Sequence, residues 1–230
     1  MTAVLEIDGL SVRFGQTRAL NDVSLALGSE TVGLIGPNGA GKTTLLDTVT
    51  GFVRPFAGRV RFEGADISHL PAWRRARIGV RRTFQAVELF DDLTVEENLV
   101  AASRTEARPA TWPLDFFGIG RYAKELAQDL PAGVRRLVGI ARAVVGNPKV
   151  LLLDEPGAGL HPEEIDALGN ALGHVHSELG MGILLVDHQL PLISLVCERV
   201  LVLNFGSVIA SGTLAYVTSD SNVVQAYLGS

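Results

Sequence analysis

The chain has 230 residues, of which 47% are hydrophobic and 20% are charged, and its formal net charge is −5. This balance is typical of one large globular domain, or of a domain with an inserted lobe, and it excludes a disordered chain. The acidic charge disfavours anionic surfaces, so we expect no nucleic-acid partner. The single cysteine, Cys197, excludes an internal disulfide and fits a reducing compartment.

Two stretches bear on membrane insertion. The N-terminus lacks a basic region followed by a long apolar run, so we expect no signal peptide. The uncharged window 200–219 is about long enough to span a bilayer. Its Asn, Gly, Ser and Thr residues indicate turns between two strands instead, so we predict no transmembrane helix.

The N-terminal third of the chain has the pattern of an antiparallel β-region. Alternating apolar residues predict strands over 4–7, 10–14 and 19–27. Residues 57–67 predict a short hairpin that ends in a glycine turn. The segment 70–82 contains five arginines, and we interpret it as a helix with a solvated basic face. A contact with a partner or with nucleic acid is the alternative for this segment, and the negative net charge disfavours nucleic acid.

A phosphate-binding motif lies inside this region. Residues 36–43, GPNGAGKT, fit the pattern G-x-x-x-x-G-K-[ST] without a mismatch. The apolar run 32–35 predicts a strand before the motif, and apolar residues at helical spacing predict a helix that stops at Gly51. Glycines let successive N–H groups point inward, and the helix N-terminus adds a positive dipole end.

We therefore expect this loop to bind the phosphates of a nucleotide. Lys42 would contact the β- and γ-phosphates, and the Thr43 hydroxyl would ligate Mg²⁺. The expected nucleotide-binding residues of the loop are Gly36, Pro37, Asn38, Gly39, Ala40, Gly41, Lys42, Thr43 and Thr44.

The pattern changes to helical between residues 88 and 145. Thr94 is the expected N-cap of a helix that starts at Val95. A loop follows around Pro109 and Pro113, and helix-like sequence returns at 121–128 and 134–145. We predict one domain, 1–230, with an α/β core formed by 1–87 and 146–230 and an inserted helical subdomain at 88–145.

The α/β pattern resumes with two apolar runs, 150–153 and 183–186, that each end in an aspartate. Between them, a helix with one buried stripe is predicted by Ile165, Leu168, Leu172, Val175 and Leu179.

Acidic residues and a histidine follow these two strands. Strand carboxyl ends face the ligand crevice, so Asp154 is placed to hold Mg²⁺ through water and Glu155 to polarise the water that attacks the γ-phosphate. A cap for the turn at Pro156 is the alternative reading of the acid pair. His188 lies at the same crevice edge, where it could hydrogen-bond the γ-phosphate; a satisfied loop histidine is the alternative.

These motifs occur together in the order of the ATP-binding-cassette (ABC) ATPases, and the chain resembles that family over nearly its whole length. The matching segments are GPNGAGKTT, RTFQ, VLLLDEP, GAGLHPEE and LLVDHQ. More closely, the chain is similar to the ATPase subunits of branched-chain amino acid importers, through residues 79–102, the helix 135–144 and the ending AYLG. The resemblance implies an α/β fold, with a P-loop NTPase core of ABC ATPase type, an antiparallel β-region and an inserted helical subdomain.

The resemblance also implies roles for further residues. Phe14 would stack on adenine, Gln85 would act as a catalytic and Mg²⁺-binding residue that links the site to the membrane partner, and residues near 130–136 would clamp ATP bound to the opposite subunit. The implied cofactors are ATP and Mg²⁺. The implied partners are membrane permease subunits and, indirectly, a solute-binding protein, with the chain on the cytoplasmic face of the cell membrane.

The clamp segment departs from the family's usual Leu-Ser-Gly-Gly-Gln. Residues 130–134 are Leu, Pro, Ala, Gly and Val, so Pro131 lacks both the hydroxyl and a backbone N–H, and Val134 lacks a polar side chain. The clamp residues are then Pro131, Ala132, Gly133 and Val134. His161 also stands where the family usually has Asp or Asn. Because a symmetric dimer would lose these donors at both sites, we expect this chain to pair with a different cassette.

The leading hypothesis is an ATP-hydrolysing subunit that powers a membrane importer for branched-chain amino acids or a related small polar solute. One alternative is a cassette with a weakened trans half-site that serves mainly as the ATP-binding partner of a second cassette. Another is a soluble ABC ATPase that is not tied to transport.

Overall fold

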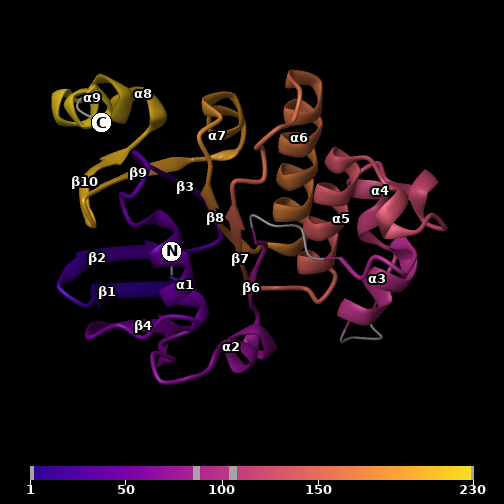
Figure 1. The fold of residues 1–230 in the computed structure, drawn as a ribbon, viewed down its shortest axis with the longest axis horizontal. Coiled ribbons are helices and arrows are strands. Elements are labelled where there is room, and N and C mark those ends of the chain that lie inside the picture. The colour runs from indigo at the N-terminus through magenta and orange to yellow at the C-terminus, as the bar shows by residue number, and fades with distance from the viewer. Residues whose placement is uncertain (1–2, 85–88, 104–107, 229–230) are drawn as a thin grey trace.

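The computed structural model describes residues 3–84, 89–103 and 108–228. Within these ranges the centre of the molecule is a six-stranded sheet in the order β10-β9-β3-β8-β7-β6 (Figure 1). Its strands are β3 (Thr31–Ile35), β6 (Val80–Arg82), β7 (Val150–Asp154), β8 (Gly182–Val186), β9 (Arg199–Asn204) and β10 (Ser207–Gly212). Every pair is parallel except β9 and β10. Strands β3, β7 and β8 are buried along their whole length, as their unbroken apolar runs predict.

A second, antiparallel sheet has the order β2-β1-β4-β5, with β1 (Leu5–Phe14), β2 (Thr17–Leu27), β4 (Ala57–Phe62) and β5 (Ala65–Asp66). The prediction of separate strands at 4–7 and 10–14 is wrong, because β1 is continuous. The apparent break in the alternation reflects register shifts between Ile7 and Leu10 and between Leu10 and Val12, with Gly9 at φ +58°. Such an irregularity bends a strand without ending it.

Helices cover the central sheet on both faces. Helix α1 (Lys42–Thr50) packs between the two sheets through Leu45, Leu46 and Val49, and it ends at Gly51 as predicted. On the other face, one continuous apolar core contains residues of α5 (Ala132–Val144), α6 (Pro162–Leu179) and α7 (Leu190–Val196). The chain ends in α8 (Leu214–Ser219) and α9 (Ser221–Leu228), at the yellow end of Figure 1. In the described ranges, no helix is both long enough and apolar enough to cross a bilayer.

The region expected to be helical contains α3 (Val95–Ala102), a short α4 (Pro113–Phe116) and α5. Thr94 caps α3 as predicted: its hydroxyl accepts a hydrogen bond from the Glu97 N–H, and the Glu97 carboxylate accepts one from the Thr94 N–H. The prediction of a helix over 121–128 is wrong, since only two 3₁₀ turns form there, Gly120–Tyr122 and Ala127–Asp129. The Val95 N–H donates to the Glu125 carbonyl oxygen, and the Ala127 N–H donates to the Leu93 carbonyl oxygen. A strand-like contact between the two segments therefore takes the place of hydrogen bonds within a helix.

The arginine-rich segment 70–82 forms α2 (Ala72–Ile78) and leads into β6. Arg74 and Arg77 are exposed, as the solvated-face interpretation requires. That interpretation is wrong for Arg75, which is only 1% exposed. The Arg75 guanidinium donates 2.8–2.9 Å hydrogen bonds to four carbonyl oxygens, those of Thr48, Val49, Ser68 and Leu70. Burial lowers the pKa of Arg75 to about 10, which leaves it charged at neutral pH. It thus closes the C-terminal end of α1.

Replacing Arg75 with Leu is expected to destabilise the fold strongly, because four carbonyl oxygens each lose a hydrogen bond and two of those bonds are fully buried. Unsatisfied buried acceptors cost about 1–3 kcal/mol each, so we expect a loss of about 3 kcal/mol or more. For a chain of this size that corresponds to a melting temperature lower by about 6–12 °C in circular dichroism. The matched control is Arg77→Leu on the same helix, which should stay within about 2 °C of the parent. Equal melting temperatures for the two variants would contradict the assignment.

Candidate functional site

The phosphate loop connects β3 to α1, as the sequence predicts. Its glycines are required by close backbone contacts at two positions. Gly36 has φ +151°, and a Cβ there would lie 2.0 Å from the Leu203 carbonyl oxygen. Gly41 has φ +105°, and a Cβ there would lie 2.6 Å from the Ala19 carbonyl oxygen. The loop therefore folds tightly against β2 and β9, and α1 begins directly after it with its free N–H groups facing the loop.

Lys42 lies across this loop and is 7% exposed. Its Nζ donates to the carbonyl oxygens of Gly36, at 2.7 Å, and Pro37, at 3.0 Å. Burial lowers the pKa of the Lys42 ammonium, while the carboxylates of Glu155 and Asp154 oppose that change. An ammonium held at the phosphate loop by two carbonyl oxygens fits a phosphate group, whose oxygens would replace the two carbonyls as its partners.

Asp154 and Glu155 follow one another at the carboxyl end of β7. Asp154 is 6% exposed, and its Oδ2 accepts a 2.8 Å hydrogen bond from Arg82 Nη2. Burial raises the pKa of Asp154, and the hydrogen bond and charge of Arg82 act in the opposite direction. Glu155 has φ +49°, a conformation that non-glycine residues rarely adopt, and its N–H donates to the Val186 carbonyl oxygen at 2.8 Å. The backbone of β8 therefore holds Glu155 in a strained position, a feature that is common in active sites.

His188 meets Glu155 across the two strand ends. Its Nε2 lies 3.0 Å from Glu155 Oε1, so the structure brings together two of the residues predicted to be catalytic. Asp187, which the sequence analysis left without a role, is 1% exposed and accepts hydrogen bonds from the N–H groups of Gly157 and Gln189 at 2.7 and 2.8 Å. These bonds join the loops after β7 and β8 and keep Glu155 and His188 adjacent.

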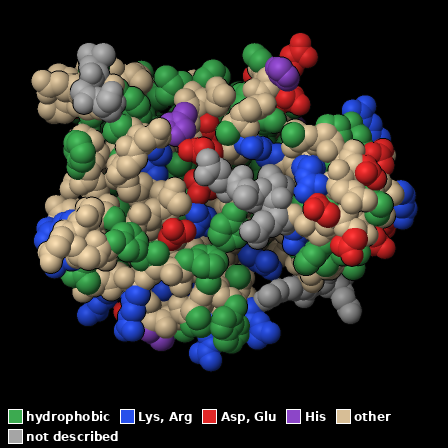
Figure 2. Space-filling model, in the orientation of Figure 1, with side chains coloured by type: hydrophobic (Ala, Val, Ile, Leu, Met, Phe, Trp, Pro, Cys, Tyr) green, Lys and Arg blue, Asp and Glu red, His purple; other side chains and the backbone are tan. Residues whose placement is uncertain are grey.

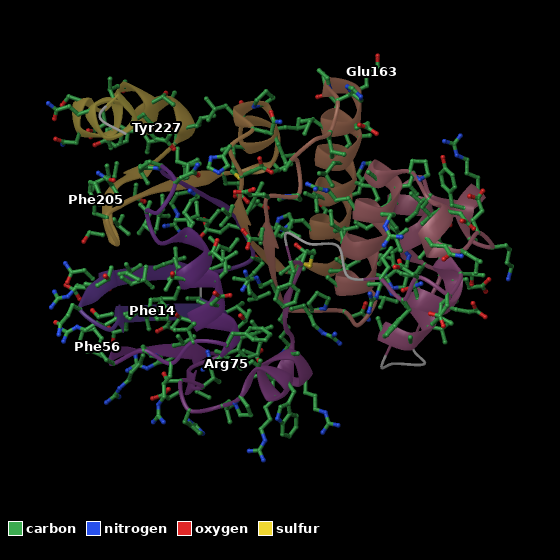
Figure 3. The ribbon with its side chains drawn as sticks, in the orientation of Figure 1. Phe14, Phe56, Arg75, Glu163, Phe205 and Tyr227 are labelled. Atoms are coloured by element: carbon green, nitrogen blue, oxygen red, sulfur yellow. The ribbon has the colours of Figure 1, made fainter. Side chains whose placement is uncertain are left out.

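A cavity of about 1110 Å³ opens beside the phosphate loop. It is lined by Gly36, Pro37, Asn38, Gly39, Ala40, His188, Asn204, Phe205, Ile209, Asn222, Gln225, Ala226 and Tyr227. Phe205, at the turn between β9 and β10, is 87% exposed, and Tyr227 comes from α9; both are labelled in Figure 3. The sequence analysis missed both aromatic residues. The turn dipeptide Phe205-Gly206 and the ending AYLG were the available signals.

Two other residues were predicted to serve the nucleotide site. Phe14 ends β1 and is 54% exposed, which leaves its ring free to stack on a planar group, but it is not among the residues that line the cavity. Gln85 lies outside the described residues.

The predicted clamp, residues 131–134, forms the start of α5. Pro131 stands at the N-cap position, and no side chain caps this helix end. The segment is not among the residues that line the cavity beside the phosphate loop. One turn further on, Arg136 donates to the carbonyl oxygens of Glu155, at 2.7 Å, and Pro156, at 3.2 Å. Arg136 therefore connects α5 to the backbone at Glu155 and Pro156 within the chain, a contact that no sequence pattern indicates.

Acidic side chains are unevenly spread over the surface. On the face shown in Figure 2, Lys and Arg side chains edge the antiparallel sheet and α2, whereas many Asp and Glu side chains gather over the α3–α4 region.

Comparison with known proteins agrees with this fold. A family model described as "ABC transporter" matches residues 20–158. The chain is 38% identical to the high-affinity branched-chain amino acid transport ATP-binding protein LivG of Escherichia coli (strain K12), over 98% of both chains. It is 37% identical to BraF of Pseudomonas aeruginosa, which carries the same description, again over 98% of both. It is also 38% identical to the lipopolysaccharide export system ATP-binding protein LptB of Escherichia coli (strain K12), over 99% of this chain and 98% of LptB.

A solved structure supports the same assignment. The crystal structure of an ATP-binding cassette of an ABC transporter, in its ADP conformation, matches with a TM-score of 0.87 and 28% identity over 100% of both chains. The likeness therefore extends over the P-loop core, the antiparallel sheet and the helical region alike. The chain belongs to the ABC transporter family, as an ATPase subunit.

Proposed function

We propose that this chain hydrolyses ATP to power a membrane importer for branched-chain amino acids or a related small polar solute. The observation that carries hydrolysis is the Glu155–His188 contact at 3.0 Å beside the phosphate loop, because a cassette that only binds ATP has no need of a paired base. The similarity to LivG and BraF over nearly the whole chain supports import. The chain would lie on the cytoplasmic face of the membrane, contact permease subunits and depend indirectly on a solute-binding protein.

In this proposal each group has one task. Lys42 and the N–H groups of residues 36–44 hold the phosphates, and Phe14 stacks on adenine. Mg²⁺, when bound through Thr43, Gln85 and, by way of water, Asp154, would draw charge from the phosphate oxygens. Glu155 accepts a proton from the attacking water, and His188 fixes the Glu155 carboxylate and the γ-phosphate. Residues 88–145 would form the helical subdomain that carries the clamp for the opposite nucleotide.

The test is solute uptake in the source organism after the gene is deleted. We expect uptake of radiolabelled leucine, isoleucine or valine to fall and to return when the gene is restored, but not when the Glu155→Gln form is supplied. Normal uptake of these and of other small polar solutes in the deletion strain would contradict an importer role.

An export role is the second candidate, and the similarity to LptB favours it specifically. The same deletion strain separates the two candidates. Unchanged amino acid uptake together with lipopolysaccharide retained at the inner membrane would favour export.

The altered clamp makes a separate prediction about the partner. A trans clamp supplies donors to the γ-phosphate, and each charge-assisted hydrogen bond contributes about 1.5–3 kcal/mol. Losing two of them would weaken a closed homodimer roughly a hundredfold or more. We therefore expect the chain alone to be a slow ATPase that works with a different cassette.

The measurement is ATPase activity of the purified chain, alone and with Pro131→Ser, Ala132→Gly and Val134→Gln combined. The triple variant should be at least about tenfold faster, since it regains the hydroxyl, the N–H and the amide. Ala132→Gly alone adds no donor and is the matched control. Brisk hydrolysis by the unmodified chain, with no gain in the triple variant, would show that the missing donors are unimportant.

A further inference from the structure

Arg82 is the last residue of β6, and its guanidinium is buried between two carboxylates. Nη2 donates to Asp154 Oδ2 at 2.8 Å, and Nη1 donates to Asp47 Oδ1. The side chains of Arg82 and Asp154 are only 4% and 5% exposed, and that of Asp47 is 30% exposed. Arg82 Nε is buried and has no hydrogen-bond partner among the described residues. The two carboxylates therefore fix the orientation of the guanidinium.

The two carboxylates belong to the two elements that are proposed to hold Mg²⁺. Asp47 lies one turn after Thr43 on α1, so the two side chains share a face of that helix. Asp154 ends β7. Arg82 thus links the helix that carries one proposed metal ligand to the strand that carries another, across two separate ion pairs.

The two residues that follow β6 also contact Asp154 and Arg82. The Asp154 N–H donates to Thr83 Oγ1 at 3.4 Å, and the Phe84 ring lies 4.9 Å from the Arg82 guanidinium carbon. Phe84 in turn packs edge-on against Phe52, with ring centroids 5.6 Å apart. Aromatic packing on one face and carboxylates on two edges leave the guanidinium little freedom to move.

The arrangement keeps the site attractive to a divalent cation. Two carboxylates and one guanidinium sum to one negative charge, so Arg82 does not cancel the attraction for Mg²⁺. In the described part of the chain, the hydrogen bond to the Asp154 carboxylate goes to Oδ2, which leaves Oδ1 to accept from a water on the metal. Carboxylates that ligate a metal commonly accept a hydrogen bond from a neighbouring side chain on one oxygen, which orients the other oxygen toward the metal.

We propose that Arg82 is a positioning residue for Mg²⁺: it orients the Asp154 carboxylate and ties α1 to β7, so that the metal strengthens ATP binding. This inference rests on the proposed function, in which Thr43 and Asp154 serve the metal. The quantity that reports it is the ratio of ATP affinities with and without Mg²⁺, because a purely structural role would change both affinities alike.

The experiment titrates the full chain with ATP by calorimetry, in Mg²⁺ and in EDTA. Mg²⁺ is expected to increase the ATP affinity of the wild-type chain, and Arg82→Met should reduce this increase by about tenfold. Losing a residue that supports a metal ligand typically costs about 10- to 100-fold, and tenfold is the lower end of that range. Affinity in EDTA should change by less than about threefold, because the phosphate loop is intact. Arg82→Lys should restore part of the Mg²⁺-dependent gain in ATP affinity, since one ammonium replaces a guanidinium that binds both carboxylates.

Two further variants keep the test decisive. Asp47→Asn breaks one of the two ion pairs while leaving Arg82 in place, and it should reduce the Mg²⁺ effect by about threefold even if Arg82→Met fails to fold. Arg199→Met removes another part-buried pair, Arg199–Glu30 at 2.8 Å, and should leave the Mg²⁺ effect unchanged.

The outcomes separate this inference from the function on which it rests. If Mg²⁺ increased ATP affinity in both Arg82→Met and Asp47→Asn as much as in the wild-type chain, the role of Arg82 would be overturned and the ATPase assignment would stay intact. A wild-type chain that binds ATP equally with and without Mg²⁺ would overturn the metal assignment and Arg82's role with it. A wild-type chain that binds no ATP would overturn the proposed function itself.

Discussion

The Glu155→Gln variant is expected to bind ATP with near-normal affinity and to lose turnover by about 10²–10⁴-fold. The amide keeps the shape of the side chain and can still meet His188, which lies 3.0 Å away, but it cannot accept the proton of the attacking water. Removing a positioned general base costs a factor of this order. The measurement is phosphate release under saturating ATP, with nucleotide affinity measured in parallel.

The control for this variant is Glu163→Gln, at the exposed first turn of α6 and labelled in Figure 3. It removes the same charge outside the site and should leave the rate within about twofold of the parent. Near-normal turnover in Glu155→Gln would mean that another group is the base. Because hydrolysis is blocked after ATP has bound, the variant should also accumulate as a nucleotide-bound dimer when the partner cassette is present.

Lys42→Ala is expected to weaken ATP binding about 10- to 150-fold. The Lys42 ammonium is bonded to the phosphate loop itself, and a charge-assisted hydrogen bond to a phosphate contributes about 1.5–3 kcal/mol. In the free chain the same change removes the donor to the carbonyl oxygens of Gly36 and Pro37, so the loop should also lose some order. Calorimetric titration with ATP measures the first effect.

Lys149→Ala is the matched control, since Lys149 is an exposed lysine paired with Glu63 on the surface. Its removal should leave ATP affinity unchanged. If Lys42→Ala bound ATP as tightly as this control, the loop at 36–43 would not be the phosphate site.

The phosphate loop and the strand-end acids were predictable because each depends on a short segment. The run 32–35, the glycines and Lys42 are contiguous, and local sequence alone places them between a strand and a helix. Helix α6 was predicted for the same reason, as its apolar residues recur at helical spacing over 18 residues. Thr94 and Glu97 form a cap within four residues of each other, which is also a local signal.

The features that sequence analysis missed depend on contacts between distant segments. Arg75 and Arg82 belong to one basic run, yet they have different partners. Arg75 binds carbonyl oxygens at the C-terminal end of α1. Arg82 binds both Asp47 and Asp154, and Asp154 lies 72 positions after Arg82 in the sequence. Residues 121–128 have a helical composition, but several of their N–H and C=O groups pair with residues 91–96. Phe205 and Tyr227 reach the phosphate loop from the last strands and helix. Composition and periodicity carry no information on such partners.

The burial of Arg75 has a consequence for the energetics of nucleotide binding. A guanidinium at the C-terminal carbonyls of α1 complements the negative end of the helix dipole, while the opposite, positive end faces the phosphate loop. The helix is therefore fixed at its far end before any ligand arrives, and its last turn has little conformational entropy left to lose. A phosphate that binds at the near end meets a preorganised dipole, so more of the electrostatic attraction appears as affinity.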